Sequence, residues 1–146
     1  MEEIKKSSFR FKRFVVIEFN IKREPVEQGD VDFTIDPSAI IDEANKLFEL
    51  KLGVYVVDKS GSFNIKLVAI GYFEFDEEKS VDTLSNYFYV NAPALIFPYI
   101  RAYISSITAL SGLRAVNLPV LNLSGLKDEL KANTKKEEIE KIDGDR

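Results

Sequence analysis

The sequence of 146 residues contains no cysteine and no histidine. Without cysteine, the chain has no disulfide, no thiolate nucleophile and no cysteine-ligated zinc. Without histidine, it lacks the residue that most often serves as a general base and as a metal ligand. Catalytic and metal-binding proteins are therefore the least favoured classes, and we expect neither a metal nor a cofactor.

A long uninterrupted apolar run is also missing. The longest, residues 87–100, is broken by Asn91 and two prolines, so no membrane span is expected. The start, Met-Glu-Glu-Ile-Lys-Lys, lacks the apolar region of a signal peptide. The formal net charge of −4 disfavours a nucleic-acid binder, which normally presents a basic face. These features predict a soluble cytoplasmic protein.

Aromatic residues, in contrast, are plentiful, with eleven Phe and six Tyr but no Trp. A single domain of this length buries a real core, but hardly all of these rings. The surplus indicates an oligomer interface or an apolar binding surface. An unusually aromatic core explains the composition equally well.

The first half of the chain alternates as β-strands do. Residues 9–21 place apolar side chains at the odd positions, with Arg13 out of phase and with Phe14 and Val16 at even positions. This pattern predicts one half-buried strand of uniform alternation.

Further alternating runs cover residues 31–36, 47–58 and 63–75. The last two flank Asp58-Lys59-Ser60-Gly61, a composition typical of a hairpin turn. Between the second and third runs, the apolar residues of 40–47 predict a brief helical turn. Together the runs predict a four-stranded antiparallel sheet with one apolar face that needs a cover.

The second half changes to helical spacing. A short helix is predicted near residues 81–88, and the main helix begins at Pro93 or Pro98 and ends near Leu110, before Ser111-Gly112 as the C-cap. The fold class is therefore α+β, with one long helix and one or two shorter ones packed on one side of the sheet.

The C-terminal part begins with an extended link, residues 113–123. Ser124 is the predicted N-cap of a last helix that ends near Asn133. Residues 134–146 form a charged run with few apolar side chains. We expect a single domain of residues 1–133 and a frayed, flexible tail.

The main helix carries an apolar stripe that is too wide for one sheet to cover. Beside it runs a strip of small residues, Ala102, Ser106 and Ala109. Small residues let a second helix approach closely, so the strip predicts an oligomer interface. The alternative is that the strip lies on the chain's own sheet.

A resemblance to a known family begins at the start of this helix. The run Pro93-Ala94-Leu95-Ile96-Phe97-Pro98-Tyr99-Ile100-Arg101 and the later Leu118-Pro119-Val120-Leu121-Asn122-Leu123 resemble the SecB family of protein-export chaperones. The residues in family order and spacing are Tyr99, Arg101, Asn117, Pro119 and Asn122, with Gly112 in the glycine region. Gly71-Tyr72-Phe73 and residues 31–36 resemble two of the family's strands.

The resemblance implies a homotetramer, built as a dimer of dimers, that needs no ATP. Such proteins hold unfolded preproteins in apolar grooves and pass them to the translocase motor SecA. By position, the groove residues would be Val31, Phe33 and Ile35 on the second strand, with Leu113, Val116, Leu118 and Leu121 on the crossover. The alternative for each is plain core packing.

Two departures concern the acidic strip on which the family docks SecA. Glu18 matches one acid, but Lys22 and Lys66 stand where the resemblance places two others. We therefore expect weak SecA docking. Some SecB-like proteins serve a single antitoxin, and this is the alternative role.

Two further classes stay open. The first is a non-enzymatic adaptor whose apolar surface binds one folded partner. The second is an enzyme or metal protein that uses the acidic groups Asp30, Asp32 and Asp36, or Asp76, Glu77 and Glu78. The second is disfavoured because no glycine-bearing loop of calcium spacing accompanies these residues.

Overall fold

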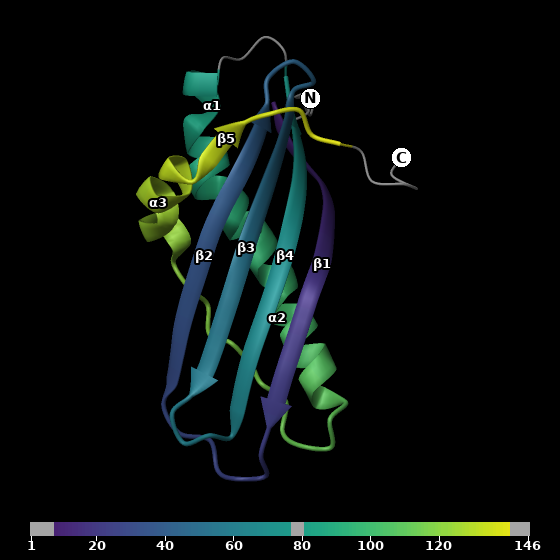
Figure 1. The fold of residues 1–146 in the computed structure, drawn as a ribbon, viewed down its shortest axis with the longest axis vertical. Coiled ribbons are helices and arrows are strands. Elements are labelled where there is room, and N and C mark those ends of the chain that lie inside the picture. Colours follow the sequence, from purple (N-terminus) through teal and green to yellow (C-terminus); the bar gives the residue numbers. More distant parts are fainter. Residues whose placement is uncertain (1–7, 77–80, 141–146) are drawn as a thin grey trace, which may run out of the picture.

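The computed structural model describes residues 8–76 and 81–140, which form an antiparallel sheet backed by one long helix (Figure 1). The long strands are β1 (Phe9–Arg23), β2 (Val31–Asp42), β3 (Leu47–Asp58) and β4 (Phe63–Phe75). They lie in the order β1-β4-β3-β2, and neighbours are antiparallel. The predicted four-stranded sheet and the β3–β4 hairpin are confirmed.

The helical elements follow β4. They are α1 (Val81–Asn86), the π-helical turn η1 (Tyr87–Asn91), α2 (Ala92–Ala109), the 3₁₀ turn η2 (Leu123–Leu126) and α3 (Lys127–Ala132). Figure 1 shows α2 behind the sheet, and its contacts with the sheet fall mainly on β1, β3 and β4, whereas α3 contacts β2. The α+β class with one long helix is therefore confirmed.

The two prolines behave differently in α2. Pro93 stands in the first turn of α2, directly after η1, and the helical conformation continues from η1 into α2 without a break. Pro98 lies inside α2 on its exposed side, where water can satisfy the carbonyl group that loses a partner. Gly112, just after the helix, has a φ of +83°, which favours glycine as predicted for the C-cap region.

The uniform alternation predicted for β1 is wrong. The pairing with β4 shifts between Phe11 and Arg13 and again between Val16 and Glu18. Each shift inserts an extra residue, so Phe14 and Val16 pack against the core. Ile17, at the second shift, is 52% exposed.

The helical turn predicted at residues 40–47 is also wrong, because β2 continues to Asp42 and turns directly into β3. The Asp42 carboxylate accepts hydrogen bonds from the backbone N–H of Asn45 at 3.0 Å and from its side-chain amide at 2.9 Å. Lys46 closes the turn with a φ of 56°. The local hydrogen bonds of Asp42 favour a tight turn over a helix here.

The predicted cap of the last helix is displaced by two residues. The side chain of Asn122, and not that of Ser124, caps η2 by accepting a hydrogen bond from the Ser124 N–H at 3.1 Å. Asn adopts this role readily because its side-chain oxygen reaches the amide two residues ahead.

The tail is not frayed at residues 134–140. Thr134–Lys136 form β5, which pairs with β2 in parallel and extends the sheet to five strands. The Ile139 N–H donates to the Asp42 carboxylate at 3.0 Å, and the Ile139 side chain is buried. The pairing with β5 gives the backbone groups at the edge of β2 hydrogen-bond partners. This pairing explains why the charged segment Thr134–Lys136 adopts a regular strand. Residues 141–146 of the predicted tail lie outside the described residues.

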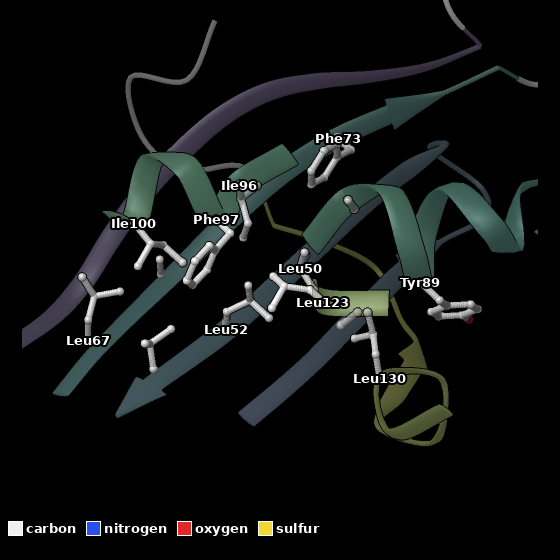
Figure 2. Packing of buried hydrophobic residues seen from close by; sticks show 14 of the residues in the cluster. Leu50, Leu52, Leu67, Phe73, Tyr89, Ile96, Phe97, Ile100, Leu123 and Leu130 are labelled. Atoms are coloured by element: carbon white, nitrogen blue, oxygen red, sulfur yellow. The ribbon is translucent and has the colours of Figure 1, made fainter. Parts of the chain in front are cut away.

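The core lies between the sheet and α2. Figure 2 shows Ile96, Phe97 and Ile100 of α2 in the same cluster as Leu50, Leu52, Leu67 and Phe73 of the strands. At Gly71, a Cβ atom would come within 2.6 Å of the Ile96 side chain, so glycine allows the helix to approach closely.

Part of the aromatic surplus lies in this core. The phenylalanines Phe9, Phe48, Phe73, Phe75 and Phe88 are buried in one cluster. Within it, the rings of Phe48 and Phe88 stack at 4.6 Å. An aromatic core therefore accounts for these five rings.

Candidate functional site

The first half of β2 leaves apolar side chains partly uncovered. Phe33 and Ile35 pair with Val56 and Val54, whose side chains are fully buried on the face of the sheet toward α2. We call this the inner face. Val31, Phe33 and Ile35 lie on it but are only partly buried, because α2 packs mainly over the other strands. These three residues are named the β2 band.

The crossover, residues 111–122, connects α2 to η2 without regular structure. Among the predicted groove residues, Val116 and Leu118 are 3% and 5% exposed and belong to the core. Leu121 is partly buried against the core, and Leu113 is 36% exposed. The structure thus leaves the β2 band, Leu113 and Leu121 as the accessible members of the predicted groove.

Three polar side chains of α2 hold the crossover in place. Arg101 donates from Nε to the Leu118 carbonyl oxygen at 3.3 Å, and the Ser105 hydroxyl donates to the Asn117 side-chain oxygen at 2.8 Å. The Thr108 hydroxyl accepts the N–H of Val116 at 2.8 Å. The family resemblance singled out Arg101 and Asn117, but neither it nor the sequence pattern pointed to Ser105 and Thr108.

Arg23, at the end of β1, fixes the beginning of the crossover. Its guanidinium group donates to the Ser111 hydroxyl at 2.8 Å and to the Arg114 carbonyl oxygen at 2.6 Å. Leu113 lies between these two contacts in sequence and lines a depression together with Pro25 and Val26 of the β1–β2 loop. Leu113 therefore belongs to the end of the molecule where that loop lies.

The small-residue strip of α2 does not lie on the chain's own sheet. Ala102, Ser106 and Ala109 are all exposed in the single chain. Close to them on α2, Tyr99 is 49% exposed, although its ring stacks on Phe14 at 5.4 Å. The strip is therefore available to a second chain.

The opposite, outer face of the sheet carries paired charges. Glu18 contacts Lys66 at 2.9 Å across β1 and β4, and both side chains are exposed. Hydrogen bonding to Glu18, together with its charge, raises the pKa of Lys66. Glu74 lies 3.9 Å from both Arg10 and Lys12. The predicted remnant of an acidic strip is thus neutralised by neighbouring cations.

The acidic groups form no metal site in the part of the chain that the structure describes. There, no three carboxylates lie close enough to hold a metal ion. Asp32 pairs with Lys59 at 3.6 Å and Asp76 with Arg10 at 2.8 Å, while Glu77 and Glu78 lie outside the described residues. Within residues 8–76 and 81–140, none of the helices has the length and apolar character needed to cross a bilayer.

A buried carboxylate, Asp58, organises the end of the sheet beside the β2 band. It accepts hydrogen bonds from the Gly29 N–H at 2.9 Å and the Ser60 hydroxyl at 2.8 Å, and also from the Ser62 hydroxyl. Burial opposes its ionisation, but the bonds from Ser62 and Ser60 outweigh burial and hold the pKa of Asp58 at about 2. Asp58 thereby ties the β1–β2 loop to the hairpin turn.

This carboxylate makes stability depend on pH. Because its folded pKa lies below the unfolded value of 3.8, its contribution is present above pH 4 and is lost as the pH falls toward 2. We expect Asp58→Asn to lower the melting temperature by several degrees at pH 7, with the difference shrinking between pH 4 and pH 2. Calorimetry across this range, with the exposed Asp32→Asn as control, measures the effect. An equal deficit at pH 2 and pH 7 would contradict it.

Comparison with known proteins adds a family assignment to this geometry. Residues 14–133 match the family described as preprotein translocase subunit SecB. An uncharacterized protein of Methanocaldococcus jannaschii is 29% identical over 96% of this chain and 98% of its own. The protein-export protein SecB of Anaplasma phagocytophilum is 28% identical over 57% of this chain and 56% of its own length. The chain thus spans little more than half of that export protein.

A solved structure has a similar fold. It is the SecB-like chaperone of Mycobacterium tuberculosis in complex with a ChAD peptide from the HigA1 antitoxin. The match has a TM-score of 0.66 and 16% identity, and it covers 78% of this chain and 91% of the other. At this identity the similarity concerns the fold alone.

Proposed function

Because the chain belongs to the SecB family, whose members are non-enzymatic chaperones, we propose that it is an ATP-independent holdase of the cytoplasm. A holdase binds an unfolded polypeptide, its client, and keeps it from aggregating. It needs an adaptable apolar surface and no acid–base pair, which agrees with a chain that has neither histidine nor cysteine.

The observation that carries this proposal is the β2 band. Val31, Phe33 and Ile35 continue the apolar inner face beyond the part of the sheet that α2 covers. Water contact at these side chains is unfavourable, and covering them with apolar side chains of a client releases that free energy without requiring a particular sequence. Leu121 of the crossover offers a further partly buried apolar side chain.

The test is binding without nucleotide. A reduced client that cannot refold should co-elute with the protein in size-exclusion chromatography and should aggregate less in its presence, and several unrelated clients should behave alike. Binding of one folded partner, with no unfolded client retained, would instead favour the adaptor.

We also propose that the chain assembles into a homotetramer through α2. The exposed strip of Ala102, Ser106 and Ala109 supports this proposal, since it permits close approach of another helix. The half-exposed Tyr99 and Leu95 add apolar area to the same helix.

The role in export is less favoured than the holdase activity itself. The resemblance implies that SecA docks through a basic, zinc-bearing tail on an acidic strip of the outer face. In this chain Glu18 is paired with Lys66 at 2.9 Å, and Lys22 adds another cation. Charge complementarity, which steers such encounters, is therefore absent. A chaperone dedicated to one antitoxin or other single partner is the second candidate, because it needs no SecA docking.

We expect a SecA-type tail peptide to bind the wild-type protein weakly. Changing Lys22→Glu together with Lys66→Glu should strengthen binding by about tenfold or more, because each substitution replaces a repulsive charge with an attractive one. Isothermal titration calorimetry at low ionic strength measures both affinities, and Lys51→Glu on the same face serves as the control. Tight wild-type binding that the double variant leaves unchanged would show that docking uses other residues.

A further inference from the structure

The polar contacts between α2 and the crossover form an ordered row. Arg101, Ser105 and Thr108 are spaced by four and three residues, so they lie on one face of the helix. They contact three consecutive crossover residues in reverse order, Leu118, Asn117 and Val116. The helix and this part of the crossover are thus held antiparallel in one register.

Thr108 is the buried member of the row. It is 1% exposed, and its hydroxyl donates to the Ile104 carbonyl oxygen at 2.7 Å while it accepts the Val116 N–H at 2.8 Å. Valine has almost the same shape and would pack equally well at this position. A buried hydroxyl is favourable here because it satisfies the Val116 N–H, which is itself buried.

Beyond Leu118 the row ends. Pro119 has no N–H, and in the described part of the chain no hydrogen bond joins residues 119–121 to the rest of the protein. Val120 is 81% exposed. The crossover therefore has two parts. Up to Leu118 it is fixed to α2 by hydrogen bonds, and beyond Leu118, where Leu121 lies, its described residues have no hydrogen bonds to α2.

We propose that Arg101, Ser105 and Thr108 are positioning residues of the client-binding surface. This inference rests on the proposed function. Apolar burial of Val116 and Leu118 is not directional, so it permits these side chains to pack in more than one register. The row of hydrogen bonds selects one register, and that register sets where the crossover continues toward Leu121 and the inner face.

The decisive comparison is Thr108→Val against Thr108→Ser. Valine removes the hydroxyl at nearly constant shape, whereas serine keeps it. We expect Thr108→Val to weaken the binding of a reduced, permanently unfolded client by about tenfold and to speed hydrogen exchange of the Val116 amide by a similar factor. Thr108→Ser should retain the affinity and the protection of the wild type.

A control separates positioning from general destabilisation. Phe88→Leu, in the aromatic cluster at the other end of the helical segment, should lower the melting temperature without changing client affinity. The inference is overturned if Thr108→Val binds the client as well as the wild type does, or if Phe88→Leu loses as much affinity for the same loss of stability. If the wild-type protein binds no client, the proposed function itself fails, and exchange at Val116 then reports only how the crossover is held.

Discussion

Replacing Phe33 and Ile35 together with threonine should weaken client binding by about 100-fold. Covering a large apolar side chain contributes roughly 1.5–3 kcal/mol, so losing two of them removes about 3 kcal/mol. Threonine is a β-branched residue of the kind that strands favour, and both positions are only partly buried, so the sheet should still form. Fluorescence anisotropy with a labelled, reduced client gives the affinity, and circular dichroism confirms the fold.

The matched control lies on the same strand. Asp32 and Asp36 point to the outer face, on the opposite side from the β2 band. The double variant Asp32→Thr/Asp36→Thr should therefore bind the client within about twofold of the wild type. If the Phe33/Ile35 variant retains full affinity, the β2 band is not the binding surface.

The second large effect concerns assembly. Substituting Ala102→Glu and Ala109→Glu should split the oligomer, because each glutamate would bring an unpaired charge into the contact at a cost of several kcal/mol. In the single chain both alanines are exposed, so the fold should be preserved. Light scattering coupled to size-exclusion chromatography measures the mass, which should fall from four chains to fewer.

Ala132→Glu is the control for this experiment. Ala132 is an exposed alanine of α3, away from the strip, and the same substitution there should leave the mass unchanged. A wild-type protein that stays monomeric at high concentration would refute the interface outright.

Local chemistry explains which parts of the fold the sequence predicts. The β3–β4 hairpin follows from alternation on both sides of a turn that contains Gly61, whose φ is 87°. The start and end of α2 follow from Pro93 and Gly112, whose backbone preferences act within a few residues. These features need no knowledge of distant contacts.

The sequence predictions are wrong where contacts between residues far apart in the chain determine the local structure. The shifts in β1 at Phe11/Arg13 and Val16/Glu18 depend on the pairing with β4. Arg13, Phe14 and Val16 break the alternation there, but the sequence alone does not show which residue of β1 is left unpaired. The three residues of β5 are charged or polar, and only the open edge of β2 gives them a strand conformation.

The placement of the candidate groove residues in the fold was predictable to a similar degree. Alternation placed Val31, Phe33 and Ile35 on one face of a strand, and the pairing with β3 agrees. The crossover has no periodicity, so nothing in its sequence distinguishes the buried Leu118 from the accessible Leu121. The only signal of the Thr108 contact is a polar residue among the buried positions of α2, and a sequence alone does not identify its partner.

The attachment of β5 has a consequence for how the chain acquires its fold during synthesis. Ile139 and Asp42, joined by a hydrogen bond, are 97 residues apart in the chain, so this contact can close only after the chain has been made as far as Ile139. A ribosome releases the chain from its N-terminus, and β2 can pair with β3 long before Thr134–Lys136 emerge. The edge of β2 at residues 39–41 is therefore the last part of the described sheet to gain a partner, and a nascent chain carries this edge unpaired until residues 134–136 have emerged.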